Sequence, residues 1–303
     1  MSVLELSAVS RWYGNVVAVN DITMTIGPGV TGLLGPNGAG KSTLLHMMAG
    51  FLPPSNGTVT IDGEPTWRRP AMYDVVGLVP EREAAYTFLT GREFVEASAK
   101  LHRLANPQHA AQHALETVEL TDAADRKIGT YSKGMRQRAK VASALVHDPQ
   151  VLLLDEPFNG MDPRQRLHMM DLLKNLADAG RTVLFSSHIL EEVEQLSDVV
   201  QVVVSGRLAA SGDFREIRRL MTDRPHVFTI RSTDDRALAS ALMGAQHTAG
   251  VAIEGSVLRV HAADFGSFTR ALAGLAREHN IGLREVIPAD ESLESVFSYL
   301  VRR

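Results

Sequence analysis

The sequence contains no cysteine and no long apolar run. The lack of cysteine excludes disulfide bonds, thiolate metal sites and a cysteine nucleophile. Apolar runs such as Val199–Val204 are short and interrupted, whereas a membrane-spanning helix needs roughly 20 mostly apolar residues. Residues Met1–Arg11 lack a basic stretch followed by an apolar one, so we expect no signal peptide. Any role at a membrane is therefore expected to be peripheral.

An excess of positive charge is also missing. The chain carries 31 Lys and Arg against 35 Asp and Glu, a formal net charge of -4, so we expect no nucleic-acid partner. Hydrophobic residues make up 45% and charged residues 22%, which is ordinary for a globular protein. A chain of 303 residues is long enough for one large domain plus a smaller one.

Strand and helix patterns alternate along the first two-thirds of the chain. Such alternation with short apolar strands predicts an α/β fold with a largely parallel sheet covered by helices. The strand candidates are Val3–Val9, Val16–Ile26, Val30–Leu34, Thr58–Ile61, Val75–Val79, Val151–Leu154, Thr182–Ser186, Val199–Val204 and Leu208–Ser211. The helix candidates are Ser42–Ala49, Arg136–Val146, Arg164–Ala179 and Ile189–Leu196.

Between the early and late strands the pattern becomes helical. One apolar set repeats at helical spacing in Phe94, Ala97, Leu101 and Leu104, and a second in Ala111, Leu115 and Val118. The sequence therefore predicts a helical subdomain at about residues 84–150 within a first domain of residues 1–212.

The remainder of the chain predicts a second, smaller domain. Residues 213–225 are polar, carry the basic cluster Arg215, Arg218 and Arg219 and end in a proline, so they are interpreted as a linker. Residues 226–303 then show the order β-α-β-β-α-β, which is typical of a ferredoxin-like unit, with a hairpin around Gly255. An amphipathic helix is expected to bury Phe265, Phe268, Leu272 and Leu275 inside this domain.

A glycine-rich loop carries the strongest chemical signal. It follows the strand Val30–Leu34, precedes a helix and fits the pattern G-x-x-x-x-G-K-[ST]. The residues are Gly35, Pro36, Asn37, Gly38, Ala39, Gly40, Lys41 and Ser42. Its glycines let backbone N–H groups converge on phosphate oxygens in front of a helix N-terminus. Lys41 can reach the β- and γ-phosphates, and the Ser42 hydroxyl can ligate Mg²⁺.

Two carboxylates follow the apolar strand Val151–Leu154. Asp155 is expected to hold Mg²⁺, and Glu156 to orient or deprotonate an attacking water. Strands that end in acids are common, so the signal depends on a shared sheet with the phosphate loop. Together the two motifs predict a P-loop nucleoside triphosphatase.

Three further elements narrow this prediction. Ser132 and Gly134 precede the helix at Arg136 and could form a second anion site, although an ordinary helix cap is the alternative. His188 ends a strand and could contact a γ-phosphate, or be purely structural. The ring of Tyr13 could stack on adenine, with Trp12 as a competing candidate and a core position as the alternative for either ring.

In this order the motifs resemble the ABC ATPase family over about residues 3–212. The resemblance rests on Tyr13, the phosphate loop, Val79-Pro80-Glu81, Tyr131–Met135, Leu154-Asp155-Glu156, Gly160-Met161-Asp162 and His188. It implies an ABC-type core with a mixed sheet. It further implies a sandwich dimer. Each ATP would lie between the phosphate loop of one subunit, extended to Thr43, and Ser132–Gly134 of the other. Asp162 would then cross the interface, and His188 would hold the γ-phosphate while Glu156 activates water.

The chain departs from the family pattern at two places. Lys133 and Met135 replace a glycine and a glutamine of the usual Leu-Ser-Gly-Gly-Gln, and Glu81 stands where glutamine is usual. A carboxylate at position 81 can still meet Mg²⁺ or water, but it adds negative charge beside phosphates. Both changes, and the ending Ser292–Phe297, resemble the branch that pairs with ABC-2-type permeases, which often export drugs, antibiotics or polysaccharide.

The resemblance thus implies an ATPase that binds ATP and Mg²⁺, dimerises, and powers a separate multi-span permease from the cytoplasmic face of the membrane. The alternative is a non-transport ABC ATPase in translation, repair or chromosome handling. His109 and His113 have a spacing that can bind zinc, but no third ligand is apparent, so they are interpreted as solvated helix residues.

Overall fold

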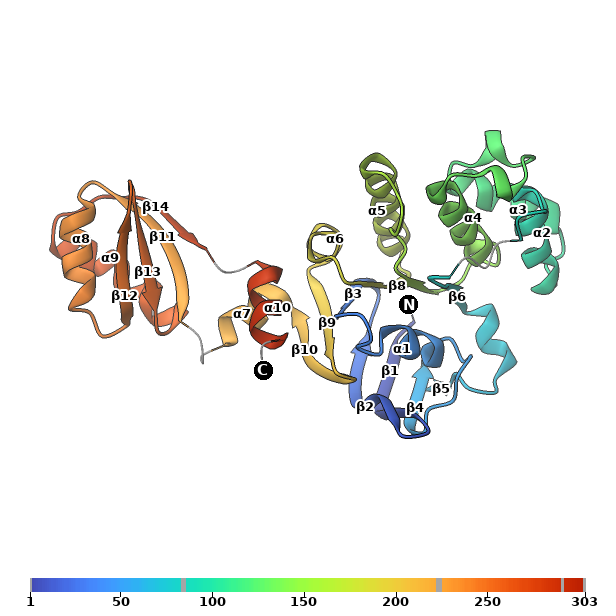
Figure 1. Cartoon of the computed structure of the whole chain (residues 1–303), viewed down its shortest axis with the longest axis horizontal. Helices are drawn as coiled ribbons and strands as arrows, with labels where there is room; N and C mark the ends of the chain where they lie inside the picture. Colours follow the sequence, from blue (N-terminus) through green and yellow to red (C-terminus); the bar gives the residue numbers. More distant parts are fainter. Residues whose placement is uncertain (1, 83–85, 222–224, 290–291, 302–303) are drawn as a thin grey trace. The chain divides into compact units, whose positions relative to one another are not determined.

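The computed structural model describes residues 2–82, 86–221, 225–289 and 292–301. Contacts divide the chain into two compact units, a first unit Met1–Ser211 and a second unit Gly212–Arg303, both of which are drawn in Figure 1. None of the helices in the described ranges combines the length and the apolar composition that a membrane span requires.

One sheet of the first unit is antiparallel and has the strand order β2-β1-β4-β5. Its strands are β1 (Leu4–Tyr13), β2 (Val16–Ile26), β4 (Asn56–Ile61) and β5 (Glu64–Pro65). Buried and exposed residues alternate from Ile22 to Ile26, because a sheet with one face on the core turns every second side chain outward.

The second sheet of this unit is largely parallel, as the sequence predicts. Its strand order is β10-β9-β3-β8-β7-β6, and neighbouring strands from β6 to β9 run parallel. The strands are β3 (Gly29–Leu34), β6 (Val76–Val79), β7 (Val151–Asp155), β8 (Thr182–Ser187), β9 (Val199–Val204) and β10 (Arg207–Asp213). Every residue of β7 and β8 is buried, which explains their continuous apolar sequence.

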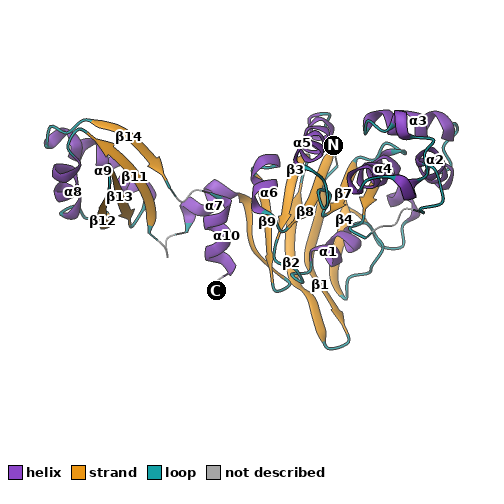
Figure 2. Ribbon diagram, turned by 45° about the horizontal axis from the view of Figure 1, so that its top comes forward, coloured by secondary structure: helices purple, strands orange, loops and turns teal. Residues whose placement is uncertain are grey.

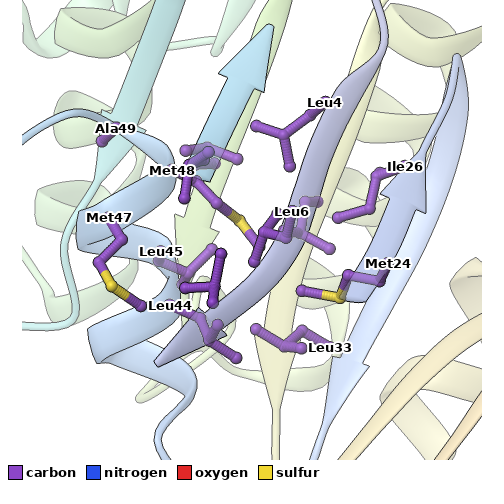
Figure 3. Packing of buried hydrophobic residues seen from close by; sticks show 14 of the residues in the cluster. Leu4, Leu6, Met24, Ile26, Leu33, Leu44, Leu45, Met47, Met48 and Ala49 are labelled. Atoms are coloured by element: carbon purple, nitrogen blue, oxygen red, sulfur yellow. The ribbon is translucent and has the colours of Figure 1, made fainter. Parts of the chain in front are cut away.

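Helix α1 (Lys41–Met48) is the centre of the core. It packs against strands of both sheets, β2 and β4 in one and β7 in the other. Figure 3 shows its apolar side chains meeting those of β1, β2 and β3; the labelled residues are Leu4, Leu6, Met24, Ile26, Leu33, Leu44, Leu45, Met47, Met48 and Ala49. Full burial of one such side chain stabilises the fold by about 1.5–3 kcal/mol. Helices α5 (Pro163–Asp178) and α6 (Leu190–Leu196) pack on β3 and β8.

The helical subdomain is formed by α2 (Gly91–Leu101), α3 (Pro107–Thr117) and α4 (Lys133–Leu145). The predicted face of α3 is confirmed, since Ala111, Leu115 and Val118 are buried. The predicted face of α2 is wrong. Its buried residues are Gly91, Val95 and Ala99, whereas Leu101 is 83% exposed.

Close packing explains why α2 buries a different face from the predicted one. This helix lies against both α3 and α4, and small side chains on its inner face allow that approach. Ser98 on α2 hydrogen-bonds Ser143 on α4 at 2.6 Å, and a Cβ at Gly91 would lie 2.2 Å from the Tyr131 hydroxyl. The spacing of apolar residues in the sequence gives no indication that α2 must approach its neighbours this closely.

The second unit contains a four-stranded antiparallel sheet of order β12-β13-β11-β14. Its elements are β11 (His226–Ser232), α8 (Asp235–Met243), β12 (Thr248–Glu254), β13 (Val257–Ala262), α9 (Phe265–Glu278) and β14 (Leu283–Pro288), followed by α10 (Leu293–Val301). This is the predicted β-α-β-β-α-β order, with the predicted hairpin around Gly255. Figure 2 shows α8 and α9 on one face of the sheet. Phe268 and Leu272 are buried there, with Phe265 and Leu275 packed against the same core.

The segment interpreted as a linker is largely a helix. Asp213 caps α7 (Phe214–Leu220) by accepting from the N–H groups of Arg215 and Glu216, and α7 packs against α10. Arg218 of the supposed polar stretch is fully buried and donates to the Pro225 carbonyl at 3.0 Å. Residues 222–224, and residues 83–85 at the predicted start of the helical subdomain, lie outside the described residues.

We expect the first unit to fold without the second. A chain ending at Asp213 keeps β10 whole, and among the described residues none beyond Leu208 belongs to the core cluster around α1. This chain should remain folded by circular dichroism and bind ATP within about threefold of the full chain, about 0.65 kcal/mol. Loss of ATP binding in a folded truncated chain would contradict the division into a nucleotide-binding domain and an accessory module.

Candidate functional site

The glycine-rich loop connects β3 to α1 and depends on close backbone approach. Gly40 caps α1 with a φ of 102°, and a Cβ there would lie 2.4 Å from the Ala18 carbonyl oxygen. Only glycine tolerates both conditions. The loop is further tied by hydrogen bonds from Ala39 N to Pro36 O (3.1 Å) and from Gly206 N to Ala39 O (3.1 Å). It is therefore a rigid cradle that opens at a helix N-terminus.

Lys41 is buried beneath this cradle. Its Nζ donates to the carbonyl oxygens of Gly35 at 2.8 Å and Pro36 at 3.4 Å. The same ammonium lies 3.6 Å from the Glu156 carboxylate. A cation with 6% exposure is compatible with burial because these oxygens compensate its charge.

The two predicted carboxylates lie at the end of β7, next to the end of β8. The hydroxyl of Ser186 contacts both residues. Ser186 Oγ donates to Asp155 Oδ1 at 2.6 Å and accepts from the backbone N–H of Glu156 at 2.9 Å. Asp155 pairs with Ser186 in the parallel register. Glu156 has a φ of 48°, a left-handed conformation that is uncommon for a non-glycine residue and recurs at functional sites.

His188 faces Glu156 directly. Its Nδ1 lies 3.0 Å from both carboxylate oxygens, so Glu156 is placed between an imidazole and the Lys41 ammonium. The His188 side chain is 43% exposed and that of Glu156 9%. The pair thus joins a buried carboxylate to a ring that reaches the surface of the site.

A second layer fixes the turn that carries His188. Ser187 Oγ donates to Glu192 Oε2 at 2.7 Å, and Arg166 of α5 lies 3.4 Å from Glu192 Oε1. Burial raises the pKa of Glu192, and the Ser187 hydrogen bond and Arg166 partly offset that shift. Neither the sequence pattern nor the motifs indicated this buried network.

Most of the predicted site residues line one cleft of about 470 Å³. Its lining residues are Ala18, Asn37, Gly38, Ala39, Gly40, Lys41, Ser42, Thr43, Glu81, Asp155, Glu156, Asn159 and His188. Ala18 and Asn159 were not predicted. Ala18 has no chemically active side chain that a motif could have indicated. Asn159 could have been inferred from its position three residues after Glu156; its N–H donates to the Glu156 carbonyl at 3.2 Å.

Tyr13 is not among the described residues that line the cleft. It ends β1 at the turn into β2. The residue is 44% exposed, and the Arg11 guanidinium lies 4.7 Å from the ring centroid. Trp12 is 45% exposed. A core position is therefore excluded for both rings, and each is accessible for stacking.

Ser132, Gly134 and Asp162 are not among the described residues that line the cleft. Ser132 and Asp162 are exposed, whereas Gly134 is buried against α5. Ser132 is the N-cap of α4, which begins at Lys133 rather than at the predicted Arg136. Asp162 is the N-cap of α5. The two caps lie side by side, since a Cβ at Gly134 would lie 1.8 Å from Gln165 Oε1 of α5.

The donor set of the cleft fits a hard cation such as Mg²⁺. Ser42, Glu81 and Asp155 all line it and offer oxygen ligands. Within the described residues no group of three or more His, Asp or Glu side chains could hold a metal ion. Mg²⁺ does not require one, because it is commonly bound through one or two carboxylates plus substrate phosphates and water.

A parallel sheet whose carboxyl ends carry a phosphate loop, two acids and a histidine, with a helical subdomain inserted before the acids, defines an ATP-binding cassette. The chain belongs to the ABC transporter ATP-binding proteins. The family model described as "ABC transporter" matches residues 19–159, and relatives at more than 30% identity cover nearly the whole chain. The predicted family, fold class and ATPase activity are confirmed.

The relatives include resistance proteins. The linearmycin resistance ATP-binding protein LnrL of Bacillus subtilis is 32% identical over 99% of this chain and 98% of its own length. The daunorubicin/doxorubicin resistance ATP-binding protein DrrA of Streptomyces peucetius is 33% identical over 97% of this chain and 91% of its own. Neither relative supports the non-transport alternative.

Solved structures agree with the fold. The ATP-binding subunit of an ABC transporter superposes with a TM-score of 0.66 at 27% identity, covering 72% of this chain and 92% of that one. A dimeric bacterial ABC transporter cassette gives a TM-score of 0.65 at 25% identity, covering 69% and 98%.

We expect Lys41→Ala and Glu156→Gln to fail at different steps. Lys41→Ala removes a charged phosphate contact, so ATP affinity should fall about 10- to 100-fold. Glu156→Gln keeps the shape of the side chain but not its basicity, so ATP should still bind while turnover falls about 100-fold or more. Equilibrium nucleotide binding and phosphate release separate the two steps. Near-normal turnover in Glu156→Gln would show that another group is the base.

Proposed function

We propose that this chain hydrolyses Mg²⁺-bound ATP at the cleft, in a dimer of two copies, and powers a separate permease that exports amphipathic, antibiotic-like compounds. The observation that carries the ATPase part is the convergence of Lys41, Glu156 and His188 on one cleft behind a phosphate loop. The proposal on the exported compounds is supported by the relatives named for linearmycin and daunorubicin/doxorubicin resistance.

In this proposal the chain's residues divide the work of hydrolysis. Backbone N–H groups of Gly38–Ser42 and the Lys41 ammonium hold the phosphates, and Glu156 accepts a proton from the attacking water. His188 orients Glu156 from one side and faces the γ-phosphate from the other. Mg²⁺, held by Ser42 and Asp155 with Glu81 nearby, would neutralise charge on the β- and γ-phosphates.

A second copy is needed to complete the site. Ser132 and Gly134 present a helix N-terminus, which favours phosphate, but they lie outside the lining of the chain's own cleft. Two copies related by a two-fold axis can place this surface of each against the cleft of the other. Asp162 lies beside that surface and would contact the partner at the same seam.

Mixing two inactive variants tests this sharing. Ser132→Arg should abolish activity by placing bulk and charge against the partner's phosphate, and Lys41→Ala should disable its own cleft. A mixed dimer retains one intact site, so an equimolar mixture should regain activity that neither variant has alone. Phosphate release against mixing ratio is the measurement. If subunit exchange is shown by sedimentation and activity still does not return, sharing between copies is excluded.

A groove between the sheet and the helical subdomain is a candidate surface for the permease. This cavity of about 240 Å³ is lined by residues that include Phe51, Tyr73, His102 and His147. Phe51 is 54% exposed and Tyr73 41%, with ring centroids 6.2 Å apart. Exposed aromatic side chains gathered at one groove are typical of a protein-binding site.

The floor of this groove is uncharged at neutral pH. The rings of His102 and His147 stack with centroids 3.8 Å apart. Burial, reinforced by the neighbouring His102, lowers the pKa of His147 to about 4, and burial also lowers the pKa of His102. An apolar segment of a permease therefore meets no buried charge there, and the chain would be held at the membrane through this contact.

We expect Phe51→Glu to uncouple the subunit from its permease. Hydrolysis by the isolated subunit should stay within twofold, because Phe51 does not line the nucleotide cleft, while permease capture should fall at least about 10-fold. Val199→Glu, at the 42% exposed first residue of β9, is the matched control and should retain capture. Co-purification with the membrane protein measures the effect; equal capture by both variants would exclude the groove.

A further inference from the structure

One buried lysine connects the two nucleotide-facing surfaces of the chain. Lys140 lies on α4, eight residues after the Ser132 cap, or about 12 Å along the helix at about 1.5 Å per residue. It is 6% exposed. Its Nζ donates to the Pro80 carbonyl at 2.6 Å and to the carbonyls of Glu81 and Arg82 at 3.3 Å each.

These acceptors belong to the loop that carries Glu81 into the cleft. The loop leaves the end of β6 at Val79, and Glu81 lines the cleft. α4 packs against β6, so an apolar residue at position 140 would satisfy packing alone. Burial of an ammonium group costs free energy unless oxygen atoms surround it. Because Lys140 donates to three successive carbonyls, it fixes the direction of the loop backbone, which a single hydrogen bond would not do.

We propose that Lys140 is a positioning residue that makes the Glu81 loop follow the N-terminal end of α4. Ser132 and Gly134 at that end face the partner's ATP, and Glu81 faces the chain's own ATP. Movement of α4 when it meets the partner's nucleotide is then passed to Glu81, which couples the two ATP sites of the dimer. This inference rests on the proposed function, because it needs two copies that share their sites.

The first test measures coupling in the full chain. In Lys140→Met, ATP affinity of the single subunit should stay within twofold, since the side chain does not line the cleft. Turnover, and ATP-driven dimerisation measured in a Glu156→Gln background, should each fall at least about fivefold, the lower end of typical coupling factors. Lys140→Arg keeps a long cation with several donors and should recover most of both.

Arg138→Met is the matched control on the same helix. Arg138 donates to the Val118 and Glu119 carbonyls at 3.1 and 3.0 Å, which lie within the helical subdomain. If Arg138→Met loses as much coupling as Lys140→Met, the effect is general loosening of α4 and the proposal is wrong. The proposal is equally wrong if Lys140→Met retains wild-type turnover and dimerisation.

A local reporter tests the contact without relying on hydrolysis. The chain has no cysteine, so Arg82→Cys, at an exposed position, takes a single spin label. The label should become more mobile when Lys140→Met is added and remain unchanged when Arg138→Met is added. No change with Lys140→Met overturns the inference. Absence of ATPase activity in the wild-type chain would instead refute the proposed function and leave this readout interpretable.

Discussion

The parallel register of β3, β8 and β7 is the constraint on which the site depends. Leu34 pairs with Ser187 and Asp155 with Ser186, so segments more than a hundred residues apart along the chain end at the same edge of one sheet. The phosphate loop, the acid pair and His188 each begin where one of these strands ends. A shift of one residue in this register would turn the side chains to the opposite face and separate Ser186 from the Asp155 carboxylate and the Glu156 N–H that it contacts.

The parts that sequence alone predicted are those whose physics is local. The strand, loop and helix around Lys41 follow from a short apolar run, three glycines and a helical pattern. The acid pair follows from a continuous apolar strand, whose full burial the structure shows. In the same way, turn residues and the alternation of apolar and polar residues predicted the hairpin at Gly255 and the element order of the second unit.

Predictions that depended on tertiary contact were less successful. The prediction for the buried face of α2 was wrong because close packing selects small residues there. Gly91 lies against Tyr131, and Gly91 and Ala99 are buried in place of larger apolar residues. The polar segment after Asp213 is a helix because α10, far along the chain, offers a surface to pack on. Lys140 gave no signal at all, since a lysine on a helix is usually solvated and only the fold brings three carbonyls to it.

The charge pattern of the cleft links substrate binding to the chemistry proposed for it. Glu156 is buried between the Lys41 ammonium and the His188 ring, and all three side chains line the cleft that would hold the phosphates. Lys41 has three N–H donors, and its Nζ lies close to the Gly35 and Pro36 carbonyls and to the Glu156 carboxylate. A phosphate that enters the cradle competes with these oxygens for the same donors. Substrate binding and the position of the proposed base are therefore linked through one ammonium.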